Sequence, residues 1–273
     1  MQMLLFPYYE DTVMDIAVSN LAYQGLFTNR LLALPKDIGI EVYCETGSQF
    51  YWDHLLPRLM DGRTGPLCVH GPYQNIDLSR EDLDYDAVKD LYQWSCELFG
   101  FWGAKHIVCH PYSFVPLNAM APGEADRRRK ICLARVVELH ELAKTCGMSM
   151  LVENMANRND LMDQQQFLDT FAPVQELNFL MDTGHMHIQN WDMALCFEAL
   201  GSRIHGYHIN DNFTDADSHL MAFEGSFDWD RFFEYYCKHT PDATLVCEYM
   251  NGPVDRITAS VERIRQHLGR NWK

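Results

Sequence analysis

Basic residues are scarce in this chain of 273 residues, with 22 lysines and arginines against 38 aspartates and glutamates and a formal net charge of −16. Nucleic acids and anionic lipid surfaces are bound largely through basic side chains, so this charge balance disfavours both as partners. The one basic run, residues 127–130, opens an amphipathic stretch and is expected to be the solvated face of a helix.

The sequence also lacks any apolar run near the roughly 18 residues that a membrane-spanning helix needs. Its first ten residues lack the basic and long apolar regions of a signal peptide, so we expect a cytoplasmic protein. Nine cysteines occur, an odd number without CxxC spacing, and most have apolar neighbours. This pattern favours reduced, buried thiols over disulfides or a zinc site made of thiolates.

Eight short apolar runs alternate with stretches of helical periodicity. The runs predict strands at residues 3–6, 38–44, 67–70, 106–109, 149–152, 178–181, 203–209 and 244–247. The periodic stretches predict helices at 48–60, 81–100, 122–146, 164–171, from about 192, 227–239 and 254–268. Residues 11–34 are expected to be a loop with helical turns.

Strict alternation of strand and helix predicts a parallel sheet, and eight such units in a chain of this length predict a (β/α)8 TIM barrel. We expect one domain spanning residues 1–273. A doubly wound open sheet is the alternative, but it would require a glycine-rich phosphate-binding turn after an early strand, and the sequence has none. The active site of a TIM barrel lies at the C-terminal ends of its strands, so candidate residues are sought there.

Four successive predicted strands end in groups that bind hard cations: Glu153, Asp182, His208 and Glu248. Three carboxylates and one imidazole suit a divalent ion such as Mn²⁺, Mg²⁺, Co²⁺ or Zn²⁺. A single acid or histidine near a strand end is usually a hydrogen-bonded structural group. Crowded carboxylates, however, would repel one another unless a cation lay between them. We therefore predict one divalent metal at these four residues, with Asn154 and Asn210 holding neighbouring ligands in place.

These motifs together resemble the xylose-isomerase-like TIM-barrel superfamily, which contains sugar isomerases and epimerases and the endonuclease IV family. The resemblance runs from the third predicted strand to the eighth. It rests on His70-Gly71-Pro72-Tyr73, His110-Pro111, Val152-Glu153-Asn154, Asp182-Thr183-Gly184-His185-Met186, His208-Ile209-Asn210-Asp211-Asn212, Asp217-Ser218-His219-Leu220, Glu224-Gly225, Asp228-Trp229 and Glu248.

The ketose 3-epimerase branch is the most similar, especially around Asp182. The resemblance implies that Glu153, Asp182, His208 and Glu248 hold one divalent metal, and that the two glutamates also move the substrate proton. It implies that His185 contacts sugar oxygens. The expected enzyme is thus an isomerase or epimerase that removes a proton beside a metal-bound carbonyl of a sugar or keto-polyol. This chain lacks the arginine that the branch carries in the loop after strand seven, so its substrate contacts are not transferred.

Endonuclease IV gives the rival interpretation, a three-zinc phosphodiesterase acting on abasic DNA. The chain resembles that family at nine ligand positions, so His70, His110, His185, Asp217 and His219 are either substrate-binding residues or ligands of further metals, up to three zinc ions in all. The acidic charge places this function second, because DNA is a polyanion. The segment Phe223-Glu224-Gly225 also departs from the usual Gly-x-Gly.

Two further alternatives remain at this point. The same metal and proton abstraction would serve a dehydratase of the inosose or dehydroshikimate type, and a metal- or sugar-binding module without activity is also compatible. Tyr8, Tyr73 and Tyr112 are expected to form the wall of a carbohydrate pocket or to pack at its rim. The expected partner is a small carbohydrate, and the apolar stripe of helix 122–146 is either core or the contact surface of a homo-oligomer.

Overall fold

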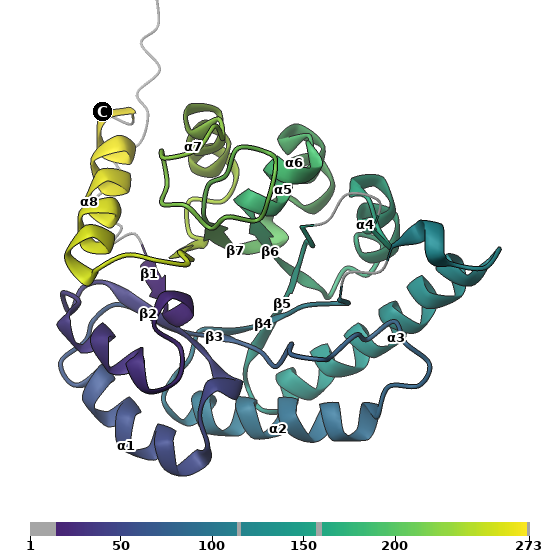
Figure 1. Ribbon diagram of the computed structural model, residues 1–273, viewed down its shortest axis with the longest axis horizontal. Coiled ribbons are helices and arrows are strands. Elements are labelled where there is room, and N and C mark those ends of the chain that lie inside the picture. Colours follow the sequence, from purple (N-terminus) through teal and green to yellow (C-terminus); the bar gives the residue numbers. More distant parts are fainter. Residues whose placement is uncertain (1–14, 114–115, 157–159, 272–273) are drawn as a thin grey trace, which may run out of the picture.

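A closed barrel of eight parallel strands forms the centre of the computed structural model, which describes residues 15–113, 116–156 and 160–271 (Figure 1). The strands follow one another in sequence order, and pairing of the first with the last closes the barrel. They are β1 (Ile16–Ser19), β2 (Gly39–Tyr43), β3 (Leu67–His70), β4 (His106–Cys109), β5 (Ser149–Glu153), β6 (Asn178–Asp182), β7 (Ile204–Ile209) and β8 (Thr244–Cys247). The predicted TIM barrel is confirmed.

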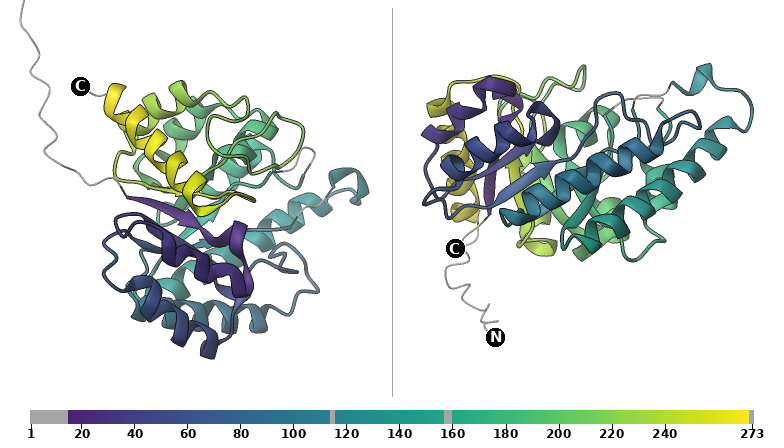
Figure 2. Two further views of the ribbon diagram at one scale, coloured as in Figure 1. Left: turned by 60° about the vertical axis from the view of Figure 1, so that its left-hand side comes forward. Right: turned by 90° about the horizontal axis from the view of Figure 1, so that it is seen from below.

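Helices connect the strands and surround the barrel (Figures 1 and 2). They are α1 (Gln49–Met60), α2 (Tyr85–Phe101), α3 (Glu124–Thr145), α4 (Gln164–Phe171), α5 (Thr183–Gln189), α6 (Met193–Leu200), α7 (Trp229–His239) and α8 (Val254–Asn271). After β1 the connection is made by two 3-10 helices, η1 (Asn20–Tyr23) and η2 (Gly25–Ala33), and α8 lies beside η2. None of the described helices is long and apolar enough to cross a bilayer.

The first strand differs from the prediction. The predicted strand at residues 3–6 lies outside the described residues, and the barrel closes without it through β1, which falls inside the stretch 11–34 that was expected to be a loop. That part of the prediction was wrong. Strand β1 has only four residues and is buried at every position, so it carries no alternation that would identify it. The expected helical turns are present, as η1 and η2.

Helix α5 was also missed, because no helix was predicted between the strand at 178–181 and about residue 192. The Asp182 side chain accepts a hydrogen bond from the His185 amide (2.7 Å) and thereby caps the N-terminus of α5. The helix has only seven residues, too few for helical periodicity to stand out. The remaining predicted strands overlap the observed ones.

Alternation along the strands separates an apolar outer core from the barrel interior. Ile107 and Val152 face outward and belong to the large core shared with the helices, whereas Val108, Leu151 and Leu180 face inward and form a small cluster of their own. Two residues further along their strands, Leu151 and Leu180 are followed by Glu153 and Asp182. The inner apolar cluster therefore forms a floor, and polar side chains occupy the barrel above it.

Candidate metal centre

The four predicted metal ligands meet at the C-terminal end of the barrel. Asp182 and His208 are paired in register on β6 and β7, and Glu153 and Glu248 approach from β5 and the end of β8. Nδ1 of His208 lies 3.3 Å from Glu153 Oε1, 3.4 Å from Glu248 Oε2 and 3.8 Å from Asp182 Oδ2. All four residues are buried.

The donor set fits one divalent ion. Ligand atoms held about 2.1 Å from an ion lie roughly 3–3.5 Å from one another, close to the spacings around His208. One donor atom each from Glu153, Asp182 and His208 also fall within 4.8 Å of one another. Three carboxylates with one imidazole are hard to bury together without a cation, and they suit Mn²⁺, Mg²⁺, Co²⁺ or Zn²⁺.

The pKa shifts of these groups also indicate that the cluster of carboxylates favours a nearby positive charge. Burial opposes an imidazolium, yet the carboxylates of Glu248, Glu153 and Glu41 raise the pKa of His208 well above its usual value. Burial also favours a neutral acid at Glu153, but His110 and His208 lower the pKa of that carboxyl well below its usual value. Burial raises the pKa of Asp182 and Glu248. A divalent ion would supply the balancing charge in place of a proton.

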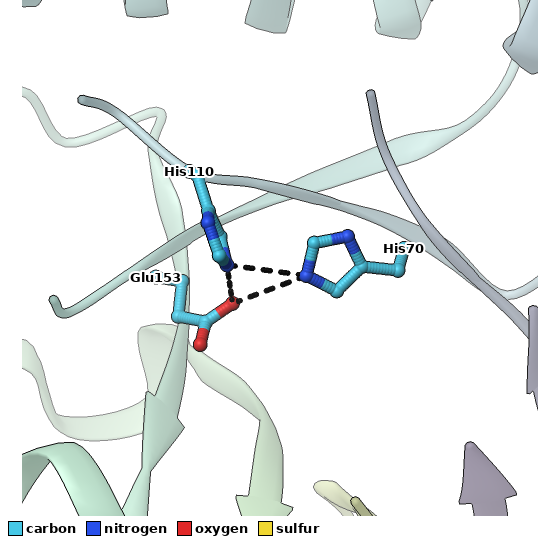
Figure 3. A group of neighbouring side chains, drawn as sticks. All are labelled: His70, His110 and Glu153. Atoms are coloured by element: carbon cyan, nitrogen blue, oxygen red, sulfur yellow. Dashed lines mark hydrogen bonds and ion pairs between the residues drawn. The ribbon is translucent and has the colours of Figure 1, made fainter. Parts of the chain in front are cut away.

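A second group of possible ligands consists of His70, His110 and Glu153, whose side chains point at one another (Figure 3). His110 Nε2 lies 3.0 Å from Glu153 Oε2 and 3.1 Å from His70 Nε2. His70 places Nδ1 3.0 Å from the Gly71 carbonyl, which can only accept, so Nδ1 donates and the Nε2 lone pair faces the group. Burial and the neighbouring His110 lower the pKa of His70 well below its usual value, which keeps it in this neutral form.

A third group consists of His185, Asp217 and His219, with Asp217 and His219 in the loop after β7. Oδ2 of Asp217 lies 3.3 Å from His185 Nε2 and 3.2 Å from His219 Nε2. The two Nδ1–H groups donate to backbone carbonyls, of Asn154 at 2.6 Å and of Glu248 at 2.9 Å, so both Nε2 atoms face Asp217. The Asp217 side chain is 33% exposed, which makes this group part of the opening of the site.

Neighbouring charges also shift the pKa values of the residues in this third group. Burial opposes protonation of His219, but the hydrogen bond with Asp217 and the charge of Glu248 raise its pKa to about 9. Burial likewise opposes protonation of His185, and Asp182 and Asp217 raise its pKa well above the usual value. The imidazoles in turn hold the pKa of Asp217 well below its usual value, against the effect of burial.

The two predicted tethering residues both contact Asp182. The Asp182 amide donates to Asn154 Oδ1 (2.7 Å), and Asn210 Nδ2 donates to Asp182 Oδ2 (2.7 Å). Asn154, directly after β5, thus holds the Asp182 backbone, and Asn210, directly after β7, holds its carboxylate.

The predicted pocket-wall tyrosines lie in different places. Tyr73 is half-buried, and its ring lies 5.3 Å from that of His110, next to the second ligand group. Tyr112 is 1% exposed, belongs to the main core and donates its hydroxyl to the Met162 carbonyl (3.3 Å). Tyr8 lies outside the described residues.

Strand β2 contributes two residues that the sequence analysis missed. Glu41 is fully buried beside His208, and the Tyr43 hydroxyl donates to Glu248 Oε1 (2.5 Å) while its ring stacks on His70 at 4.0 Å. The available signal was a single carboxylate inside the apolar run 38–43. Helices cover the outer face of a barrel strand, and its inner face lies inside the closed barrel. A charged residue in such a strand is therefore buried and needs a buried partner.

Comparison with known proteins gives one family and several similar folds. The profile of xylose isomerase-like TIM barrels matches residues 54–267. Among solved structures, a D-tagatose 3-epimerase-like protein is 20% identical with a TM-score of 0.81, and the match covers 94% of this chain and 97% of that one. D-psicose 3-epimerase from Clostridium cellulolyticum H10 is 16% identical with a TM-score of 0.75, covering 93% and 99%.

A third similar structure is the IolI protein with a bound zinc atom, 14% identical with a TM-score of 0.72 and covering 94% of this chain and 99% of that one. Identities this low establish a shared fold and leave the reaction open.

Proposed function

The chain belongs to the xylose isomerase-like TIM-barrel family, and on that premise we propose that it is a divalent-metal-dependent isomerase or epimerase of a sugar or sugar-like keto-polyol. Glu153, Asp182, His208 and Glu248 hold the metal. The names of the similar structures support this class of substrate, since they include a D-tagatose 3-epimerase-like protein and a D-psicose 3-epimerase. The zinc atom of the IolI structure supports a metal.

The observation that carries the proposal is the pair of glutamates on either side of His208. Glu153 and Glu248 lie 3.3 Å and 3.4 Å from the same nitrogen, but they come from β5 and β8, which β6 and β7 separate in the barrel. A substrate carbon above this point therefore has a carboxyl group on each side. Isomerisation and epimerisation both need one group that removes a proton and one that returns it.

Glu153 and Glu248 would divide the proton transfer between them, one removing a proton and the other returning one. Both are proposed ligands of the metal, so both would be ionised when the ion is bound, and either can act as the base on its own side of the substrate. A bound divalent ion would supply Lewis-acid stabilisation of negative charge on the substrate oxygens. His185 and His219, at the opening, are placed to donate hydrogen bonds to substrate hydroxyls.

The test is hydrogen exchange in D₂O with a panel of ketoses and keto-polyols, using protein loaded with Mn²⁺, Co²⁺, Mg²⁺ or Zn²⁺. We expect deuterium to enter at the carbon next to the carbonyl, and we expect Glu153→Gln and Glu248→Gln each to abolish the exchange. Glu224→Gln, an exposed-loop change away from the ligands, is the matched control and should retain it. Loss of water from the substrate would instead indicate a dehydratase, and no exchange on any substrate with any metal would refute the proposal.

A second candidate, a three-metal phosphodiesterase, is favoured by one specific observation. All nine residues that resemble endonuclease IV ligands fall in four groups of possible metal ligands, in which Glu153 and His208 each occur twice and Glu41 is a tenth residue. A chain that needed one metal would not require the second and third groups to be complete. The net charge of −16 argues against DNA as the substrate, so we rank this function second.

Metal stoichiometry and nuclease activity separate the two candidates. Three zinc ions per chain, together with cleavage of abasic-site DNA that is lost in His70→Ala and His219→Ala, would establish the phosphodiesterase. One ion per chain and no cleavage would exclude it. The DNA assay needs low and high salt, because the affinity of a protein for DNA depends strongly on salt concentration.

A further inference from the structure

Glu41 is a carboxylate in the middle of β2 that the proposed reaction does not use. Its neighbours Ile40 and Val42 face the outer core, so the alternation of the strand directs Glu41 into the barrel. The residue is 0% exposed. It lies on the far side of His208 from the other carboxylates, with His208 Nε2 3.2 Å from Glu41 Oε1 and 3.3 Å from Oε2.

The contact with His208 is the one ion pair that Glu41 makes within the described chain, and lysine and arginine are absent from its partners there. A fully buried carboxylate is costly unless it is paired and hydrogen-bonded. A leucine or valine would fill this place in the barrel interior without that cost, as Val108 does on β4 and Leu151 on β5. The acid therefore has a role that an apolar side chain would not perform.

That role follows from the two nitrogens of the imidazole ring. Only one nitrogen carries a proton in the neutral ring, and the hydrogen bond made by one nitrogen decides which of them is free. With Nε2–H donated to Glu41, the lone pair of Nδ1 faces Glu153 and Glu248. A carboxylate behind a metal-binding histidine in this way fixes its tautomer and ring orientation.

We propose that Glu41 is a positioning residue that accepts the Nε2–H of His208 and thereby presents Nδ1 as the metal ligand. The inference rests on the metal centre of the proposed function and adds a residue that touches neither the metal nor the substrate. It also explains why carboxylates lie on both sides of His208. Those on the Nδ1 side would bind the metal, and Glu41 on the Nε2 side would orient the imidazole ring.

The test compares the Zn²⁺ affinity of the wild-type chain with those of Glu41→Met and Glu41→Gln, measured by competition with a chromophoric chelator. Methionine has nearly the shape of glutamate but is a poor hydrogen-bond acceptor, so we expect affinity to fall by about 10–100-fold. Glutamine keeps an acceptor oxygen and should lose less. Asp77→Asn is the matched control, because Asp77 is a buried carboxylate paired with Arg128 away from His208. It should lower stability and leave Zn²⁺ affinity unchanged.

A second measurement separates positioning from simple loss of negative charge. Ring ¹⁵N spectra of the Zn²⁺-loaded wild type should show His208 protonated on Nε2, and Glu41→Met should show a change in the state of that ring. Unchanged Zn²⁺ affinity in Glu41→Met would overturn the inference, as would reduced affinity with an unchanged His208 ring. Melting curves of the metal-free proteins verify folding, and Glu41→Leu, which also removes the acceptor, carries the same test if Glu41→Met does not fold. A wild type that binds no divalent ion would instead refute the proposed function.

Discussion

His208 presents its two ring nitrogens to two different sets of carboxylates, with Glu153, Asp182 and Glu248 on the Nδ1 side and Glu41 on the Nε2 side. A single histidine thus links the proposed ligands to the strand across the barrel. Its position is set by the barrel wall and by partners on both sides, which is the kind of pre-organisation that a metal ligand needs.

Metal binding should release protons. The pKa of His208, the imidazole among the four proposed ligands, is raised well above its usual value, because the carboxylates of Glu248, Glu153 and Glu41 outweigh the opposing effect of burial. A ligand with a raised pKa is protonated at neutral pH, so a metal must displace the proton, and affinity should increase as pH rises. We expect apparent Zn²⁺ affinity to rise from about pH 6 to about pH 8.

Calorimetry in two buffers of different ionisation enthalpy would measure the protons released per ion. The His187→Gln variant is a control, since His187 contacts Ser226 and its pKa is lowered by burial. The expected proton release should be the same in this variant as in the wild type. Affinity that does not change with pH would contradict the assignment of His208 as a metal ligand.

At the scale of single residues, the meeting of Glu153, Asp182, His208 and Glu248 could be predicted, because each follows an apolar run and barrel geometry brings strand ends together. That they bind a metal stays a prediction. Glu41 could not be placed in the same way, because it lies inside a strand and its role depends on the ring facing it across the barrel. A contact of that kind has no counterpart in sequence spacing.

At the scale of elements, Asp182 ends β6 and also caps α5. Asp182→Asn should lose metal binding but keep the cap, because asparagine is as good an N-cap as aspartate. The adjacent Asn210 can accommodate the change, since its buried Oδ1 has no partner among the described residues and can accept from the new amide. Asp182→Ala should lose both functions and be less stable than Asp182→Asn by about 0.5–2 kcal/mol.

Denaturant unfolding of the two metal-free variants measures this difference. The comparison of Asp228→Asn with Asp228→Ala is the matched control, because Asp228 caps α7 by the same kind of hydrogen bond, to the Arg231 amide (3.1 Å). Equal stability of the two Asp182 variants would show that the cap contributes nothing.

Strand β4 carries a buried histidine at its N-terminal end, His106, opposite the end that leads to His110. Burial lowers the pKa of His106 to about 3, from 6.5. The folded state therefore stays unprotonated below pH 6.5 while the unfolded chain takes up a proton, so stability is lost as pH falls from 6.5 toward 3.

The His106→Gln substitution removes the titrating group and with it this dependence of stability on pH. We expect the wild type to lose stability relative to the variant by about 2 kcal/mol between about pH 6.5 and about pH 5, at roughly 1.4 kcal/mol per pH unit. Denaturant unfolding at several pH values measures the difference. His54→Gln, at an exposed site on α1, should show no such pH dependence, and a constant difference between wild type and His106→Gln would refute the account.

The element pattern itself could be predicted wherever a strand was followed by a helix long enough to show its period. The prediction failed at β1 and at α5, where the elements have four and seven residues. At these lengths hydrogen bonding to neighbouring strands and a capping carboxylate decide the structure, and neither leaves a repeating pattern.

At the scale of the whole molecule, the proposed metal joins β5, β6, β7 and the end of β8, so its removal should weaken the closed barrel. An ion bound only by the folded state adds about 2.7 kcal/mol of stability at a free concentration of about 100 times Kd. With a melting temperature that shifts by roughly 2–4 °C per kcal/mol for a domain of this size, chelation should lower it by about 5–10 °C.

Thermal unfolding with and without a chelator measures this shift, and Glu153→Gln provides the comparison because it should melt at one temperature in both conditions. A wild type insensitive to chelation would show that the ligands do not hold an ion in the folded state. The barrel class was predictable from the order of elements, and the resemblance to endonuclease IV indicated nine residues of one site. The contacts that divide these residues into groups, and the presence of Glu41 among them, required the three-dimensional structure.

The apolar floor of Val108, Leu151 and Leu180 has a kinetic consequence. Because these side chains are fully buried, the described part of the barrel offers no route past the ligands toward its other end. In the proposed function, metal, substrate and product would then share the mouth beside Asp217, with the metal the deepest of the three. The ion would bind before the sugar, and a bound sugar would shield the ion from chelators until the sugar leaves.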